Sequence, residues 1–153
     1  MMATQSVSAN RLEANKALVR TALEEVFVNK NLDAAEQFYG DVYIQNNPNI
    51  PDGREAMVGY FSQIFQSFPD YAPNIDLMMA EDDLVMVYLT WKGTHTGEPF
   101  LGVASSGTPV VTKTSDVFRV RDGKIVEHWD VVDRTGMLVP LGLMTIQQTQ
   151  TAK

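Results

Sequence analysis

Two aspartates and a histidine lie on two neighbouring segments of the sequence that have the composition of paired β-strands. Asp116 lies within residues 110–120, and His128 and Asp130 lie within residues 125–132. If the pairing places Asp116 opposite Asp130, their Cβ atoms are about 4.5–5.5 Å apart. Two carboxyl groups this close in a partly apolar cavity do not both ionise readily, so one of them keeps its proton. Such a pair, with His128 two residues away, is suited to general acid–base catalysis.

The turn between these segments decides whether the two aspartates meet, because a shift of one residue moves every side chain to the opposite face of a sheet. A two-residue loop, Asp122-Gly123, places Asp116 opposite Trp129. A three-residue loop that also contains Lys124, with the glycine in a left-handed bulge position, places Asp116 opposite Asp130. We predict the three-residue loop.

The three-residue loop also sorts the neighbouring side chains between the two faces of the sheet. It pairs Phe118 with His128 on the face of the aspartates. It gathers Ile125, Val117 and Trp129 on the opposite, convex face, where a second subunit could cover apolar surface. A homodimer is the expected assembly.

A further predicted strand, residues 84–95, carries apolar side chains and the second histidine. Alternation places Leu89, Trp91 and His95 on one face of this strand. If that face points inward, both histidines of the chain reach the same cavity.

Each of these polar residues also has an ordinary structural interpretation, and the sequence leaves both open. Asp116 and Asp130 could lie on the solvent side of the sheet, where most aspartates lie. His95 lies beside a polar turn, and His128 could be a strand-edge residue in an ion pair. The segment Asn46-Asn47-Pro48 could simply end a strand.

The order of the predicted elements is helices first and strands afterwards. Apolar residues recur at helical spacing between residues 12 and 27 and again between residues 57 and 68. This order predicts an α+β domain, in which N-terminal helices pack on a curved antiparallel sheet and enclose a cone-shaped space that suits a small ligand. The predicted strands are residues 42–46, 75–80, 84–95, 110–120 and 125–132, and the predicted limits are a flexible tail at 1–10, a single domain at 11–145 and a flexible tail at 146–153.

Composition narrows the classes of function. The chain has 153 residues, of which 44% are hydrophobic, enough for one domain with a core. A formal net charge of -7 argues against nucleic-acid partners and anionic membranes, and no apolar stretch is long enough to cross a bilayer. The sequence has no cysteine, no Gly-rich phosphate loop and only two histidines on separate segments, so we expect no metal and no organic cofactor. We expect a soluble, cytoplasmic protein.

Five short motifs follow one another along the chain. They are Tyr43–Pro48 (YIQNNP), Asp52–Glu55 (DGRE), Gly93–Glu98 (GTHTGE), Asp116–Val120 (DVFRV) and Asp122–Val132 (DGKIVEHWDVV). In this order they closely resemble the motifs of the SnoaL-like polyketide cyclases, also called ester cyclases, of the nuclear transport factor 2-like superfamily.

This resemblance implies a cone-shaped α+β barrel, commonly a homodimer formed through the sheet, and it supports the three-residue hairpin. In these cyclases the aspartate of the Asp-x-Phe-Arg motif, which corresponds to Asp116, is the acid–base residue for an intramolecular aldol condensation of a polyketide methyl ester. The resemblance implies no metal or organic cofactor.

The segment Gln45-Asn46-Asn47-Pro48 departs from the family pattern, which often reads Gln-His-Asn-Pro. An amide that cannot titrate, Asn46, therefore replaces a pocket histidine. The segment also resembles the Gln-Asn motif of limonene-type epoxide hydrolases, in which the Asn helps to hold the attacking water and a paired Asp acts as base. The Arg-x-Asp of that branch is absent, because Leu89 and Trp91 occupy its places, so a hydrolase of this sequence must use another carboxylate.

These observations predict a cofactor-free enzyme that acts on a hydrophobic small carbonyl compound by general acid–base catalysis, as a cyclase or a related isomerase or lyase. The alternatives are epoxide hydrolysis or dehydration in the same pocket, and a small-ligand-binding module without catalysis. The predicted catalytic residues are Asp116, His95, His128 and Asp130, and the predicted substrate-binding residues are Asn46, Tyr43, Asn47, Leu89, Trp91 and Phe118.

Overall fold

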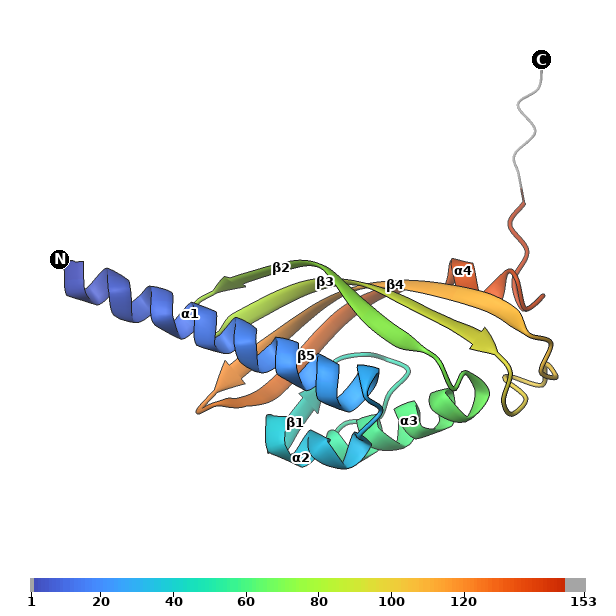
Figure 1. Ribbon diagram of the computed structural model, residues 1–153, viewed down its shortest axis with the longest axis horizontal. Helices are drawn as coiled ribbons and strands as arrows, with labels where there is room; N and C mark the ends of the chain where they lie inside the picture. The colour runs from blue at the N-terminus through green and yellow to red at the C-terminus, as the bar shows by residue number, and fades with distance from the viewer. Residues whose placement is uncertain (1, 148–153) are drawn as a thin grey trace, which may run out of the picture.

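The computed structural model consists of a curved five-stranded sheet with its N-terminal helices packed against one side (Figure 1). It describes residues 2–147; residue 1 and residues 148–153, which include most of the predicted C-terminal tail, lie outside the described residues. The predicted α+β class is confirmed. The elements are α1 (Met2–Ala22), η1 (Leu23–Val28), η2 (Leu32–Ala34), α2 (Ala35–Phe38), β1 (Tyr39–Gln45), α3 (Arg54–Ser67), β2 (Ala72–Glu81), β3 (Leu84–His95), β4 (Thr108–Arg121), β5 (Lys124–Asp133) and α4 (Thr135–Leu138).

The first helix and its continuation cover part of the sheet. α1 begins at Met2, so it includes residues expected in the N-terminal tail, and the flexibility of that segment stays a prediction. The chain then continues as a π-helical segment, η1, which buries Leu23, Val26 and Phe27. Neither α1 nor any other helix within residues 2–147 combines the length and apolar character needed to cross a membrane.

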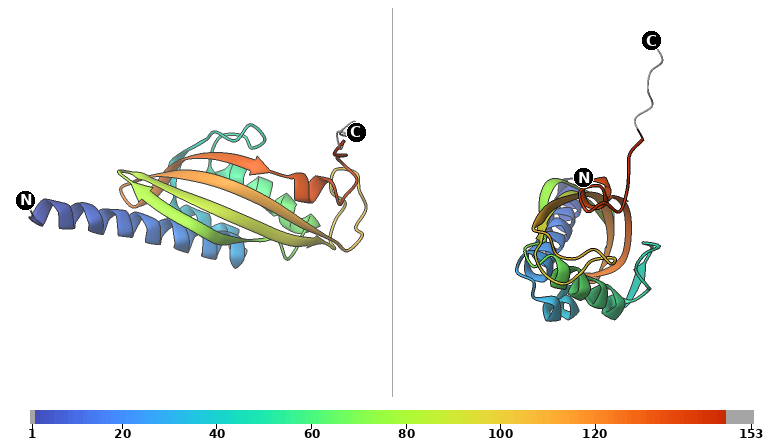
Figure 2. Two further views of the ribbon diagram at one scale, coloured as in Figure 1. Left: turned by 90° about the horizontal axis from the view of Figure 1, so that it is seen from above. Right: turned by 90° about the vertical axis from the view of Figure 1, so that its right-hand side faces the viewer.

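The sheet has the strand order β1-β5-β4-β3-β2, and all its pairs are antiparallel except β1 with β5. β1 is parallel to β5 because the chain passes through α3 and three further strands before it returns beside β1. The predicted antiparallel pairing is confirmed for β2 to β5, and β1 adds a parallel edge strand to it. The end-on view in Figure 2 shows the strong curvature of the sheet, but β1 and β2 stay edge strands, so the expected barrel is not closed.

The turn between β4 and β5 differs from the predicted one. Arg121 pairs with Lys124 across the two-residue loop Asp122-Gly123. Both loop residues have positive φ, 50° and 71°, as a tight two-residue hairpin requires. The predicted three-residue loop is therefore wrong, because the Asp-Gly pair adopts this left-handed conformation readily.

A bulge at Val126 restores the predicted register further along the hairpin. Val120 pairs with Ile125, but Arg119 pairs with Glu127, so Val126 is an extra residue on β5. Beyond the bulge Phe118 pairs with His128 and Asp116 pairs with Asp130, as predicted.

The convex face of the sheet carries only part of the predicted apolar group. Val117 and Trp129 are half-buried there, and Val131 is 77% exposed. Ile125 is fully buried in the core, because it precedes the bulge and so faces inward; its predicted place on the convex face is wrong. The homodimer stays a prediction.

Candidate active site

A largely apolar cavity lies between the helices and the inward faces of β1, β3, β4 and β5. Aromatic rings pack together along it: Trp91 stacks on Tyr71 and Phe61 with ring centroids 5.2 Å and 5.6 Å apart. An apolar concavity with a few convergent polar groups is the usual form of a small-molecule site. The polar and charged lining residues are Tyr39, Tyr43, Gln45, Asn47, Tyr60, Tyr71, Thr112, Thr114, Asp116, His128, Asp130 and Arg134.

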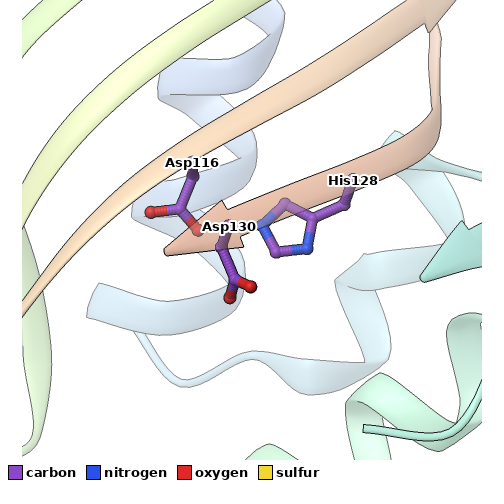
Figure 3. Close-up of side chains that lie close together, drawn as sticks. All are labelled: Asp116, His128 and Asp130. Atoms are coloured by element: carbon purple, nitrogen blue, oxygen red, sulfur yellow. Dashed lines mark hydrogen bonds and ion pairs between the residues drawn. The ribbon is translucent and has the colours of Figure 1, made fainter. Parts of the chain in front are cut away.

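Strand alternation brings three of the predicted acid–base residues into this cavity. Asp116 faces inward from β4, and His128 and Asp130 face inward from β5. Figure 3 shows the three side chains lying close together in front of the sheet. Asp116 is only 7% exposed, so its alternative placement on the solvent side of the sheet is wrong.

A hydrogen-bonded chain links Asp116 to β1 through His128. Oδ1 of Asp116 lies 2.8 Å from Nε2 of His128, and Nδ1 of His128 lies 2.8 Å from Oε1 of Gln45. The backbone N–H of Asn47 donates to the same Oε1 at 3.0 Å, so this atom is an acceptor and Nδ1 carries a proton. One proton must then lie between Nε2 and Oδ1, because two acceptors would otherwise face each other. The pair therefore holds one movable proton, as imidazolium with carboxylate or as imidazole with carboxylic acid.

The other contacts of this pair fix its orientation. Thr114 donates its hydroxyl proton to Oδ2 of Asp116, and the indole N–H of Trp91 donates to Oγ1 of Thr114 at 3.3 Å. The ring of Phe118 stacks on the imidazole of His128 with centroids 4.9 Å apart. Reacting groups held by packing and hydrogen bonds in this way are preorganised for chemistry.

Asp130 faces the same cavity but has different contacts. Asn47 donates its amide N–H to Oδ2 of Asp130 at 2.7 Å. Partial burial raises the pKa of Asp130 above its ordinary value, and the nearby Asp116 adds to this rise, although the bond from Asn47 and the charge of His128 oppose it. Burial likewise raises the pKa of Tyr43. Burial thus shifts both groups toward the protonated form, which can donate a hydrogen bond.

His95 does not line this cavity, and the prediction that both histidines reach it is wrong. Its side chain is fully buried, with its ring 5.0 Å from that of Phe68. Nε2 lies 3.0 Å from the backbone oxygen of Glu98, and Nδ1 has no hydrogen-bond partner within the described residues. The inward face of β3 is as predicted, but His95 lies four residues beyond Trp91, where the cavity no longer extends.

Asn46 also lies outside the cavity, contrary to the prediction. Its side chain is exposed, and its Nδ2 donates to the backbone oxygen of His128 at 3.0 Å. The alternation of β1 and the residues after it points Gln45 inward and Asn46 outward. The other predicted binding residues, Tyr43, Asn47, Leu89, Trp91 and Phe118, all line the cavity.

The sequence does not predict seven of the polar lining residues: Tyr39, Gln45, Tyr60, Tyr71, Thr112, Thr114 and Arg134. Two of them lie two residues from a predicted site residue on the same segment: Gln45 precedes Asn47, and Thr114 precedes Asp116. The two-residue period of a strand is the signal that could have identified these two, whereas Arg134 lies beyond the predicted strand 125–132.

The side chains of Asp116, His128 and Asp130 also offer groups that can bind a metal ion. One ligand atom each from Asp116, His128 and Asp130 lies within 4.8 Å of the others. To bind an ion at about 2.0–2.2 Å, Asp116 and His128 would have to break the hydrogen bond between them. The absence of a metal stays a prediction.

Known proteins similar to this chain share its fold. The sequence model of the SnoaL-like polyketide cyclases matches residues 17–141. AclR from Streptomyces galilaeus, a candidate hydroxylase, is 27% identical, with a TM-score of 0.81 over 88% of this chain and 89% of that one. IdmH from Streptomyces antibioticus, a candidate polyketide cyclase, is 28% identical, with a TM-score of 0.71 over 84% and 98%. No curated protein matches the sequence significantly.

Proposed function

The chain belongs to the SnoaL-like polyketide cyclase family, and from that premise we propose that it is a cyclase-type enzyme using general acid–base catalysis. The proposed reaction is an intramolecular aldol condensation of an apolar carbonyl compound. The observation that carries the proposal is the contact of 2.8 Å between Nε2 of His128 and Oδ1 of Asp116 at the wall of an apolar cavity. A buried group that can both take and return one proton is what this reaction requires.

In the proposed mechanism Asp116, as the carboxylate, removes a proton from a carbon activated by adjacent carbonyl groups. The enolate carbon then attacks a second carbonyl carbon of the same molecule, and a C–C bond forms. The resulting alkoxide takes the proton back from the pair, so the enzyme ends in its initial state. The cycle is redox-neutral and uses no co-reactant, and the imidazolium of His128 offsets the negative charge of the enolate.

Asp130 and Tyr43 have supporting roles in this proposal. Because burial raises the pKa of both groups, each is suited to donate a hydrogen bond to a substrate carbonyl. Asn47 holds the carboxyl group of Asp130 in the cavity. The apolar and aromatic lining excludes water, which strengthens these interactions.

The test is the substitution Asp116→Asn, which keeps the size of the side chain but removes its base. With an enolisable polyketide-like ester identified by screening, we expect kcat to fall by about 10²–10⁴-fold. The matched control is Asp33→Asn, the same change at an exposed position of η2, which should leave kcat unchanged. Unchanged kcat in a folded Asp116→Asn variant would disprove the proposed role of Asp116 as the base.

A second candidate function is hydration of a substrate such as an epoxide. It is favoured by the contact of 2.7 Å between Asn47 and Asp130, since an amide and a carboxyl group side by side could together hold a water molecule. The measurement that separates the two reactions is turnover in isotopically labelled water. Label in a carbon–oxygen bond of the product indicates hydration, and unlabelled product indicates cyclisation.

A further inference from the structure

Arg134 brings a positive charge to the cavity, at the end of β5. His128, Asp130, Val132 and Arg134 line the cavity in succession along this strand and the residue that follows it. Among the lining residues that the structure describes, Arg134 is the only lysine or arginine. Because its side chain is half-buried, its charge is only partly solvated and is available to a ligand.

The hydrogen-bonding capacity of this guanidinium is mostly unused. Its Nη2 donates to the hydroxyl oxygen of Tyr60, on α3, at 3.2 Å. Within residues 8–147 Arg134 forms no ion pair, whereas Arg54 and Arg119 each contact a carboxylate. A guanidinium has five N–H donors, and Tyr60 keeps its own proton after accepting from Arg134. The two side chains together therefore present several donors and a positive charge.

The backbone of Arg134 lies well beyond that of Asp130 in the direction of β5. A strand rises about 3.4 Å per residue, so Asp133 lies about 10 Å beyond Asp130, and Arg134 follows it. The intervening lining includes Val132. The positive charge of Arg134 also opposes the rise in the pKa of Asp130 and of Tyr71, so its field reaches the cavity interior.

We propose that Arg134 and Tyr60 form a subsite for an anionic oxygen, and that the substrate is an apolar acid. Its carboxylate, or its ionised phenol or enol, binds Arg134, and this contact presents an enolisable carbonyl at the other end of the molecule to Asp116. A guanidinium suits this role because its planar donors match a carboxylate. The assignment of the two ends rests on the proposed function, whereas the anion subsite is testable without turnover.

The experiment compares two probes, phenylacetate and phenylacetamide, which differ in charge but little in shape. Each is titrated into isotope-labelled protein, and the NMR signals of cavity residues, such as the indole N–H of Trp91, report binding. We expect the wild type to prefer phenylacetate, and Arg134→Gln to weaken phenylacetate by about tenfold without affecting phenylacetamide. Tyr60→Phe should weaken phenylacetate by about threefold. Arg11→Gln removes the same charge from an exposed position of α1 and should change neither affinity.

The outcomes separate the subsite from the proposed reaction. Equal affinity of the wild type for the two probes, or binding of neither, would overturn the subsite, as would equal weakening of both by folded Arg134→Gln. Asp116→Asn should keep its affinity for phenylacetate while it loses turnover. Failure of the proposed reaction therefore shows in the turnover of Asp116→Asn, and failure of the subsite shows in the binding of Arg134→Gln.

Discussion

The two histidines of the chain face inward from different strands of one sheet, and both are buried, but their surroundings differ. His128, on β5, contacts the carboxyl group of Asp116 and the amide oxygen of Gln45. His95, on β3, contacts a backbone oxygen and the ring of Phe68. The first imidazole can pass a proton to a partner, and the second cannot.

The groups that contact each imidazole ring, rather than burial or residue type, therefore indicate which histidine has a chemical role. The ring of His95 has a backbone oxygen and apolar rings as neighbours, and no carboxylate contacts it within the described residues. At His128 the charge of an added proton is offset by Asp116 at 2.8 Å. We therefore propose a structural role for His95 and a catalytic role for His128.

The largest expected effect contrasts the two histidines directly. His128→Gln should lower kcat by about 10²-fold, because it removes the group that shares a proton with Asp116. His95→Gln should leave kcat unchanged and lower the free energy of unfolding by about 1–2 kcal/mol, since it disturbs buried packing. Steady-state kinetics and denaturant unfolding of both variants measure these effects. Equal loss of kcat in the two variants would remove the distinction between the regions.

The next effect concerns the backbone next to His95. A Cβ atom at Gly97 would lie 1.8 Å from the backbone oxygen of Gln66, at the end of α3. Gly97→Ala should therefore lower the free energy of unfolding by about 3 kcal/mol, because backbone must move to relieve the overlap. Gly59→Ala, within α3, is the matched control. Nothing lies within 4 Å of its added Cβ, so it should stabilise the protein by about 0.5–1 kcal/mol. Equal stability of the two variants would contradict the tight packing inferred here.

A smaller effect is expected at Thr114, which contacts the acid–base pair without belonging to it. Thr114→Val removes the hydroxyl that donates to Asp116 and accepts from Trp91. One lost hydrogen bond of about 1 kcal/mol corresponds to a fall in kcat of about fivefold. Thr90→Val, the same change on β3, removes a hydroxyl that donates to Asp76 outside the cavity, and should leave kcat unchanged. An unchanged kcat in Thr114→Val would argue against its positioning role.

The smallest effect is on stability and depends on pH. Burial raises the pKa of Asp130 in the folded state, so the folded protein binds a proton more tightly there than the unfolded chain, and ionised Asp130 destabilises the fold. At pH values above the folded-state pKa of Asp130, Asp130→Asn should therefore raise the melting temperature by about 2 °C. This gain should vanish below about pH 4.

Asp133→Asn provides a control of opposite sign at the end of the same strand. Hydrogen bonds from Thr135 hold the pKa of Asp133 below its ordinary value, so its carboxylate stabilises the fold above the unfolded-state pKa and this contribution is lost as the pH falls. Asp133→Asn should lower the melting temperature at neutral pH. Thermal unfolding across the pH range compares the two variants, and the same sign for both would contradict the assigned environments.

The sequence predicts the pairing of Asp116 with Asp130 but not the way in which the hairpin achieves it. Turn chemistry specifies the two-residue loop at Asp122-Gly123, whereas the facing of Asp116 and Asp130 depends on the bulge at Val126. A bulge leaves little trace in a sequence, because Val126 is an ordinary strand residue. The misplacement of Ile125 on the convex face follows from that omission alone.

The candidate site is predictable where alternation along one strand suffices, and unpredictable where the extent of the cavity matters. Alternation explains why Asp116 and Trp91 face inward, and it would also have revealed Gln45 in place of Asn46. It does not reveal that the cavity ends before His95, because helix α3 and the loop after β3 fill that region. Such packing between distant segments has no local signal in the sequence.

The most direct test of the proposed acid–base pair follows the ring nitrogens of His128 and the carboxyl carbon of Asp116 by NMR at neutral pH, with Asp116→Asn and Asp130→Asn to assign the carboxyl signals. We expect a protonated Nδ1 and one proton shared between Nε2 and the carboxyl group. Asp116→Asn should then change the signals of the ring nitrogens. An unprotonated Nδ1, or ring-nitrogen signals that Asp116→Asn leaves unchanged, would contradict the shared proton.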